Sequence, residues 1–340
     1  MILVTGGAGY IGSELVRTLL SRNHKVRVLD KLMFGIEPIL EIKDRIDLRI
    51  GDIRNPPKDI MEDISCVIHL AGLSNDPTSE YNPDANRDIN YIGTVNLAEM
   101  AKIENVPRFI FASSCSVYYS LDPNDNLKTE DTEVNPTAPY SWSKRMAEIE
   151  LSKMKTNTFH PVMLRKGTIF GQSHRMRYDL VLNTFTKCAY QNRSLTVLSG
   201  GEMWRPMLNI KDAIEAYIKC ATCPAEQVSG QIFNVLHKNY RILELAHWEK
   251  YVLKNNCNTN ISIDVDYATN VPPRSYRVSG EKIEKSLDYK TRNGASEAII
   301  EMWKNLEKGI DISDPIYYNI KWVEKLLEME KRLKQIGSVF

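Results

Sequence analysis

The sequence predicts an α/β fold, in which a doubly wound parallel sheet is followed by a smaller C-terminal α/β domain. Strand-like apolar runs alternate with helix-like runs through the first half of the chain, a pattern typical of a parallel sheet with helices on both faces. After about residue 170 the helical runs alternate with shorter strands. The chain has 340 residues, of which 43% are hydrophobic, and this suffices to bury a core for one large domain or two unequal ones.

The elements of the main sheet can be placed in order along the chain. Six strand-like runs are expected, at residues 2–5, 25–29, 46–50, 66–70, 108–112 and 161–165, with helical patterns between them such as 11–21 and 89–104. The second part is expected to hold helices at 180–191 and 211–221 and strands at 195–198 and 231–235. We therefore divide the chain into a first domain at 1–170, a second domain mostly within 171–318, and a C-terminal helix at 319–340.

The C-terminal tail has the pattern of a strongly charged helix. Its apolar residues recur at heptad-like spacing, at Trp322, Leu326, Met329, Leu333 and Ile336. We expect this helix to pack onto its own chain, and a contact between subunits is the alternative.

Composition and charge exclude several classes of protein. The formal net charge is +1, without the basic surplus typical of a nucleic-acid partner. No stretch approaches the roughly 20 apolar residues of a membrane span. The chain starts directly in a strand-like run without the features of a signal peptide, so a cytoplasmic protein is expected.

The six cysteines do not predict a metal site or a disulfide. Cys220 and Cys223 form a CxxC, but no second CxxC or nearby histidine completes a ligand set. The pair also falls at the end of an apparent helix, before Pro224. We expect plain thiols there.

A glycine-rich turn joins the first strand to the first helix. Gly6, Gly9 and Gly12 give GxxGxxG within residues 5–12, and Tyr10 and Ile11 complete the turn. A residue without Cβ lets the backbone approach a pyrophosphate, and the helix N-terminus supplies free N–H groups and the positive end of its dipole. This context predicts a Rossmann domain that binds a dinucleotide.

Acidic residues after the second and third strands indicate which dinucleotide. Asp30 ends the second strand, 18 residues after Gly12, where a carboxylate accepts hydrogen bonds from both adenosine ribose hydroxyls and repels a 2′-phosphate. NAD is therefore favoured over NADP, although Lys31 weakens this preference. Asp52, followed by Ile53, is suited to contact the adenine edge.

Residues 140–144 read YxxxK. At positions i and i+4 of a helix, Tyr140 and Lys144 share one face. A neighbouring ammonium and an oxidised nicotinamide both favour phenolate and lower the tyrosine pKa from about 10. The phenolate then takes a proton from a substrate hydroxyl while hydride leaves the carbon. Ser114, preceded by Ser113, closes the fifth strand at the edge where such sheets place ligands.

As a set, these motifs resemble the extended short-chain dehydrogenase/reductase family, and within it the NAD-dependent epimerase/dehydratase branch that acts on nucleotide sugars. The resemblance rests on TGGAGYIG, Asp30, GDIR, HLAG, SSCSVY and YSWSK. It implies NAD at the carboxyl edge of the sheet, a C-terminal substrate domain and a homodimer that uses the YxxxK helix. It also implies that Tyr140 is the acid/base and that Lys144 holds the nicotinamide ribose.

The resemblance assigns further contacts. For the cofactor these are Leu70, Ala71, Gly72, Asn90 and Ser113. For the nucleotide sugar they are Ser74, Ser114, Thr168 and two phosphate candidates, Arg205 and Arg274. The loop that starts at Gly171 resembles that of a subset acting on unusual sugars.

The type of reaction is indicated by the two residues that follow Ser114, Cys115 and Ser116. Members of the branch are expected to oxidise a sugar hydroxyl, usually at C4. Dehydratases carry an Asp-Glu pair at the positions of Cys115 and Ser116, and decarboxylases carry a Glu at the position of Ser116. Without those carboxylates, re-reduction of the 4-keto sugar from its other face is favoured, which is C4 epimerisation.

Three alternatives remain open. One is a C4 dehydrogenase or reductase that releases or consumes the 4-keto sugar. Another is a proton shuttle by Cys115 and His174, although Ser116 holds the aligning position. The last is a catalytically inactive NAD-binding regulator, which the presence of both Tyr140 and Lys144 disfavours.

Overall fold

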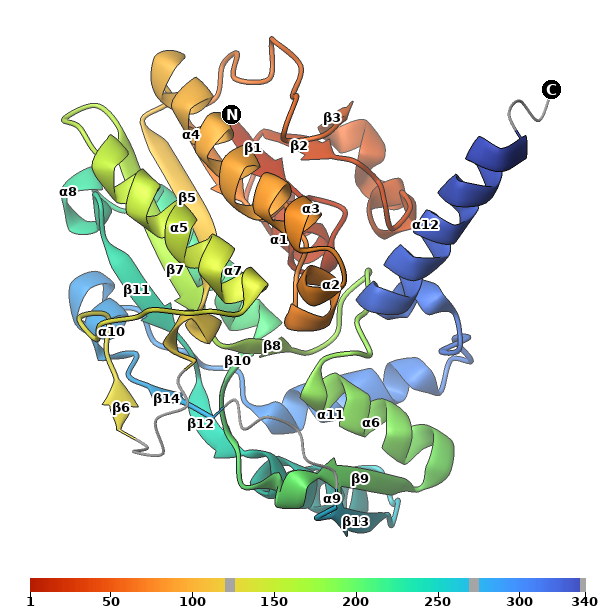
Figure 1. Ribbon diagram of the computed structural model, residues 1–340. Coiled ribbons are helices and arrows are strands. Elements are labelled where there is room, and N and C mark those ends of the chain that lie inside the picture. Colours follow the sequence, from red (N-terminus) through yellow and green to blue (C-terminus); the bar gives the residue numbers. More distant parts are fainter. Residues whose placement is uncertain (120–125, 269–274, 337–340) are drawn as a thin grey trace.

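The computed structural model describes residues 1–119, 126–268 and 275–336, and its centre is a seven-stranded parallel sheet (Figure 1). The strand order is β11-β7-β5-β4-β1-β2-β3. The strands are β1 (Ile2–Thr5), β2 (Val26–Asp30), β3 (Asp47–Ile50), β4 (Cys66–His69), β5 (Arg108–Ser114), β7 (His160–Lys166) and β11 (Ile232–Val235). The predicted doubly wound α/β fold is confirmed.

Helices cover both faces of this sheet. Against one face pack α4 (Thr94–Ile103) and α5 (Pro139–Met154), which bury apolar residues against β4 and β5. The other face is covered by α1 (Tyr10–Ser21) and α7 (Ile210–Thr222). The remaining helical segments around the sheet are η1 (Glu37–Arg45), α2 (Asp76–Tyr81), α3 (Pro83–Arg87), η2 (Asp88–Gly93), η3 (Cys115–Tyr118) and α8 (Ala225–Val228).

One strand lies elsewhere than the sequence suggested. We expected residues 231–235 to belong to the smaller domain, but β11 pairs with β7 and forms the edge of the main sheet. The helix before it, α7, contacts α1, β4 and β5. The chain therefore returns to the first domain after residue 209, because β7 leaves an open edge that a buried apolar strand can cover.

The smaller domain lies below the carboxyl edge of the main sheet in Figure 1. Its sheets are β12-β10-β8, β13-β9 and β14-β6. Their strands are β6 (Leu127–Lys128), β8 (Thr168–Phe170), β9 (Ser194–Leu198), β10 (Trp204–Asn209), β12 (Lys238–Arg241), β13 (Ser262–Asp266) and β14 (Arg277–Val278). The helices are α6 (Val181–Asn192), η4 (Ser199–Gly201), α9 (Ile242–Asn256), α10 (Glu281–Leu287), α11 (Ala295–Leu306) and η5 (Pro315–Tyr317).

The last helix, α12 (Asn319–Ile336), does not pack along its own chain as expected. Its start is anchored, because Asn319 is buried and Trp322 Nε1 donates to Met33 O at 2.6 Å. The rest of the helix projects from the body (Figure 1), and Met329 and Ile336 are 50% and 68% exposed. The heptad-like stripe is therefore covered only at its first turns.

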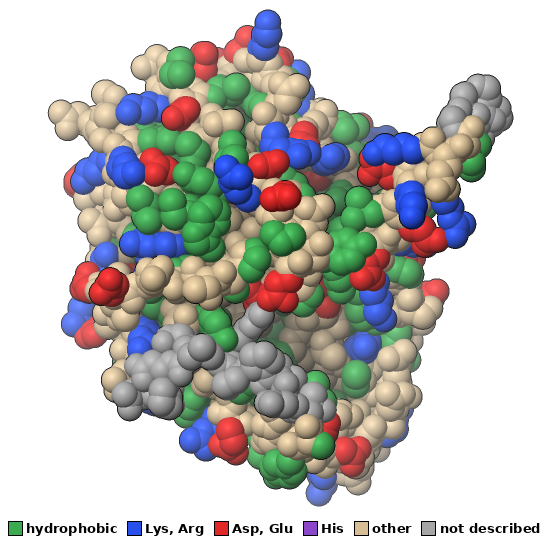
Figure 2. Space-filling model, viewed as in Figure 1, with side chains coloured by type: hydrophobic (Ala, Val, Ile, Leu, Met, Phe, Trp, Pro, Cys, Tyr) green, Lys and Arg blue, Asp and Glu red, His purple; other side chains and the backbone are tan. Residues whose placement is uncertain are grey.

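The surface carries both signs of charge. On the face that Figure 2 shows, Lys and Arg side chains are interspersed with Asp and Glu. None of the helices described is long and apolar enough to cross a bilayer.

Candidate active site

A cavity of about 400 Å³ opens at the carboxyl ends of the parallel strands. Parallel sheets place ligands at this edge, and the volume falls in the range of small-molecule sites. Its walls come from both domains, since residues after β1, β2, β4 and β5 face Lys166, Thr168, Arg205 and Tyr276. The cavity runs along the sheet edge, with lining residues at or after the ends of β3, β2, β1, β4, β5 and β7. This extent suits a dinucleotide and a second ligand.

The glycine turn is built for close approach at one end of the cavity. Gly6 has φ +74, and a Cβ there would lie 2.7 Å from Ala71 N. A Cβ on Gly12 would overlap the carbonyl oxygen of Gly6. The turn therefore excludes side chains and leaves the backbone N–H groups at the start of α1 facing the cavity, which is the arrangement that binds a pyrophosphate.

Asp30 lies beside this turn as predicted. Its carboxylate accepts from Ala8 N at 2.9 Å and from Leu32 N at 2.8 Å, so the backbone on both sides fixes its position. Burial raises its pKa. Two of its lone pairs are used, and the others remain for ribose hydroxyls in the cavity that it lines.

Lys31, Asp52 and Ile53 line the same end of the cavity. Arg54 binds the Asp52 carboxylate through Nε and Nη2 at 3.0 and 2.6 Å and holds its pKa well below the usual range. Lys31 Nζ lies 3.4 Å from the same carboxylate. Asp52 therefore stays ionised, as an acceptor for an adenine amino group requires.

Leu70, Ala71 and Gly72 line the middle of the cavity after β4. Asn90 lies one layer behind them, because its amide donates to Leu73 O at 2.7 Å and accepts from Leu73 N at 2.8 Å. Asn90 thus fixes the loop instead of lining the cavity. Tyr10 lines the cavity, but its hydroxyl donates to Gly171 O at 2.6 Å and so joins the two domains.

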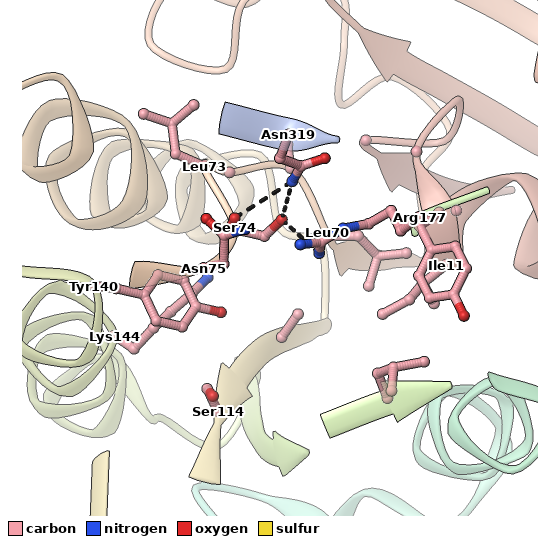
Figure 3. Close-up of a pocket in the computed structure, with 18 of the residues that line it drawn as sticks. Ile11, Leu70, Leu73, Ser74, Asn75, Ser114, Tyr140, Lys144, Arg177 and Asn319 are labelled. Carbon is pink, nitrogen blue, oxygen red and sulfur yellow. Dashed lines mark hydrogen bonds between the residues drawn. The ribbon is translucent and has the colours of Figure 1, made fainter. Parts of the chain in front are cut away.

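Tyr140, Lys144 and Ser114 converge at the other end of the cavity (Figure 3). Tyr140 and Lys144 come from the first two turns of α5, which begins at Pro139, and Ser114 faces them from the end of β5. Lys144 Nζ lies 5.8 Å from the centroid of the Tyr140 ring and 4.7 Å from that of Phe111. Two elements therefore bring a phenol, an ammonium and a hydroxyl to one place.

The pKa of Tyr140 is governed mainly by burial. Burial raises it to about 12, and the Asp76 carboxylate adds to the rise, while Arg177 and a hydrogen bond with Ser114 oppose it. The pKa of Lys144 falls to about 7 because it is buried and close to Lys166. Without a further positive charge at this site, Tyr140 therefore holds its proton at neutral pH.

A buried ion pair ties the catalytic helix to the sheet. Glu148, one turn after Lys144, accepts from Arg165 Nε at 2.9 Å and Nη2 at 2.7 Å. Ser113 Oγ donates to the same carboxylate at 2.6 Å, so Ser113 points away from the cavity that it was predicted to line. Arg165 also donates to Tyr118 OH at 2.7 Å. The network joins α5 to β5 and β7.

The predicted substrate residues surround the Tyr140 end. Ser74, Thr168 and Arg205 line the cavity, and the Arg205 guanidinium lies 5.9 Å from the Tyr276 ring. Arg274 lies outside the described residues.

Several cavity residues were not predicted. Arg177 donates to Ser74 Oγ at 3.0 Å and pairs with Asp179, and Asn319 donates to the same Oγ at 2.9 Å (Figure 3). Asp76 and Lys166 also line this end. The sequence did carry a signal for two of them. Lys166 directly follows the apolar run 161–165, and Arg177 is one of two arginines, with Arg175, in the loop 171–180. Asn319 had none.

The thiol alternative finds no support in the geometry. Cys115 is buried outside the cavity, and its Sγ faces Arg165 O at 3.1 Å. His174 is exposed and bound to Glu14, with Nδ1 and Oε1 2.6 Å apart. Ser116 does line the cavity. Cys220 and Cys223 are free, and their carbonyl groups accept from Arg108.

Comparisons with known proteins point to the same chemistry. The model of the NAD dependent epimerase/dehydratase family matches residues 2–235. A Methanocaldococcus jannaschii protein, provisionally named UDP-glucose 4-epimerase, is 32% identical over 64% of this chain and 72% of its own. UDP-glucuronic acid decarboxylase 1 of Danio rerio is 30% identical over 64% of this chain, which spans about half of that relative (53%).

A solved structure shows the same fold over nearly the whole chain. The UDP-glucuronic acid 4-epimerase of Bacillus cereus, in complex with UDP-glucuronic acid and NAD, superposes with a TM-score of 0.78. It is 24% identical, and the match covers 90% of this chain and 99% of that one. With the family match and the convergence of the glycine turn, Tyr140, Lys144 and Ser114 in one cavity, this chain belongs to the NAD dependent epimerase/dehydratase family.

Proposed function

We propose that the protein is an NAD-dependent nucleotide-sugar 4-epimerase, which oxidises a sugar at C4 and reduces the 4-keto sugar from its other face. The observation that carries this proposal is the convergence of Tyr140, Lys144 and Ser114 at the carboxyl edge of the sheet. The positions after Ser114 hold Cys115, which points away, and Ser116, so neither supplies the carboxylate of a dehydratase or decarboxylase.

The residues present fit NAD. A Cβ at Gly6 or Gly12 would strike neighbouring backbone, so both glycines are needed for the tight turn that brings backbone N–H groups to a pyrophosphate, and Asp30 is fixed beside that turn for the adenosine ribose. When bound, an oxidised nicotinamide would bring a positive charge to the site and would supply the acceptor for the C4 hydride. Lys144, whose Nζ approaches Gly72 from the Tyr140 end of the cavity, would hold the nicotinamide ribose.

Tyr140 exchanges the proton of the C4 hydroxyl. Its pKa of about 12 in this environment must fall before the phenolate forms, and a positive charge at the site lowers it. Tyr140 would thus lose its own proton to solvent when the cofactor binds, and the phenolate would then accept the proton of the C4 hydroxyl as hydride leaves C4. Ser114 donates to the same sugar oxygen and keeps it in line with Tyr140.

The diphosphate and sugar lie in the part of the cavity nearest the smaller domain. Arg205 is placed to pair with the phosphates, where a guanidinium binds two oxygens at once, and we propose Arg274 for the same role. Ser74 and Thr168 are placed to bind sugar hydroxyls. The relatives reported above are named for UDP sugars, so we propose uridine as the base.

We further propose a homodimer that acts in the cytoplasm. The outer side of α5 exposes Trp142, whose ring meets that of Tyr91 edge to face at a centroid distance of 5.7 Å, and Ile103 at the end of α4 is 75% exposed. Exposed apolar side chains on two helices that contact each other favour a subunit contact. All six cysteines are free, which is typical of a reducing compartment.

The test uses Tyr140→Phe. The variant keeps the ring and removes the proton donor, so kcat for interconversion of UDP-glucose and UDP-galactose should fall by about 100-fold or more, while NAD affinity stays the same. Tyr251→Phe, at an exposed tyrosine of α9, is the control and should keep the wild-type rate. Wild-type turnover in Tyr140→Phe would refute the assignment.

A further inference from the structure

Lys166 is a cation at the reacting end of the cavity that the mechanism above does not use. It ends β7 and stands in register with Ser114 on the neighbouring strand β5. Both residues line the cavity. Among the described residues it makes one hydrogen bond, from Nζ to Ser113 O at 2.9 Å, which uses one of the three donors of an ammonium.

In the described part of the chain, no carboxylate balances the charge of Lys166. Among residues 1–119, 126–268 and 275–336, no carboxylate forms an ion pair with it. Glu148 is already bound by Arg165, and Asp179 by Arg177. Burial lowers the pKa of Lys166 to about 8, and Arg177 adds to the fall, so the group is still mostly protonated at neutral pH.

Among the described residues, no carboxylate contributes to the shift in the pKa of Lys166. The Cys115 thiol raises the pKa of Lys166 and Arg177 lowers it, and Lys166 in turn lowers the pKa of Lys144. The Asp76 carboxylate, which lines the same end of the cavity, raises the pKa values of Tyr140 and Tyr276. A half-buried ammonium in such surroundings is stabilised when an anion binds beside it, because isolated charge is costly away from water.

The position of Lys166 indicates which part of the ligand that anion belongs to. On the proposed function, the C4 oxygen lies at Ser114 and Tyr140, and neighbouring strands are about 4.8 Å apart. Lys166 is therefore within reach of a group attached one or two carbons from C4. The diphosphate is excluded, because it is attached at C1, on the opposite side of the sugar ring, and Arg205 serves that end.

We propose that Lys166 binds a carboxylate at C6 of the sugar, so that the preferred substrate is a nucleotide-linked uronate. This inference rests on the proposed 4-epimerase function. The Lys166 ammonium donates to the carboxylate while it keeps its bond to Ser113 O, and it thereby orients the ring with C4 toward Tyr140. Lys166 is a specificity-determining residue, and it takes no part in hydride or proton transfer.

The test compares two probes that differ only at C6, UDP-glucuronate and UDP-glucose, and measures kcat/KM for C4 epimerisation of each. The wild type should prefer UDP-glucuronate by about 10-fold or more. In Lys166→Gln, whose amide can still donate to Ser113 O, this preference should fall by about 10- to 100-fold, the size expected of a charged hydrogen bond. The loss should lie in KM for UDP-glucuronate, and Lys166→Arg should restore part of the preference.

Lys153→Gln is the matched control, because Lys153 is an exposed lysine of α5 that pairs with Glu150 at 2.8 Å on the surface. It makes the same change of charge and should leave the preference unchanged. Equal or better use of UDP-glucose by the wild type, or an unchanged preference in Lys166→Gln, would overturn the inference and leave the proposed function standing. Failure of the wild type to epimerise either probe would instead overturn the proposed function, and the inference with it.

Discussion

The buried pair of Glu148 and Arg165 gives the sharpest prediction about stability. Glu148 is fully buried, Arg165 is 1% exposed, and two hydrogen bonds of 2.7 and 2.9 Å join them. The substitution Glu148→Gln keeps the shape but leaves the Arg165 guanidinium buried without a counter-ion. Removing one partner of such a pair costs about 3–5 kcal/mol. This is a large part of the roughly 5–15 kcal/mol that stabilises a typical domain.

Urea denaturation followed by circular dichroism measures the loss. Glu150→Gln on the same helix is the control, because its bond to Lys153 lies at the surface and should change the free energy of unfolding by less than about 1 kcal/mol. The double variant Glu148→Gln/Arg165→Met should recover part of the loss, since it removes the orphaned charge as well. A loss below about 1 kcal/mol in Glu148→Gln would refute the view that this pair ties α5 to the sheet.

Two further predictions concern the glycine turn and a second buried acid. Gly12→Ala should raise the Kd for NAD by about 10-fold or more in fluorescence titration, because the new Cβ overlaps Gly6 O. Gly294→Ala is the control and should leave the Kd unchanged, because Gly294 has φ −83, which any residue can adopt. Burial raises the pKa of Glu249 from 4.5 to about 8, so the folded state binds the extra proton and the free energy of unfolding falls as pH rises from 4.5 to 8. Glu249→Gln should abolish this dependence and stabilise the protein at pH 8 by about 3–5 kcal/mol, measured by urea denaturation across pH; an unchanged pH profile would contradict it.

The features that the sequence predicted well are those with a local signal. The first strand, the glycine turn and Asp30 all lie within the first 30 residues, and their spacing alone indicates a parallel sheet with a dinucleotide site. Tyr140 and Lys144 lie one helical turn apart, so their shared face also follows from the sequence. The family match confirmed the fold and the cofactor that these signals indicated.

The features that were missed depend on contacts between distant residues. Asn319 meets Ser74 across 245 positions, and β11 joins β7 after an excursion through the smaller domain. Neither has a local pattern that distinguishes it from an ordinary helix start or strand. The burial of Tyr140 and the carboxylate of Asp76, which together raise its pKa, likewise follow from packing that the YxxxK spacing does not reveal.

The central claim is that hydride leaves C4 and returns to the same carbon. The most direct measurement is proton NMR of the purified protein with UDP-glucuronate in deuterated water, without added cofactor, while absorbance is followed at 340 nm. The account predicts the C4 epimer at equilibrium, with hydrogen retained at C4 and no lasting rise in absorbance. Accumulation of a 4-keto sugar with an equal amount of NADH would contradict it and would establish a C4 dehydrogenase.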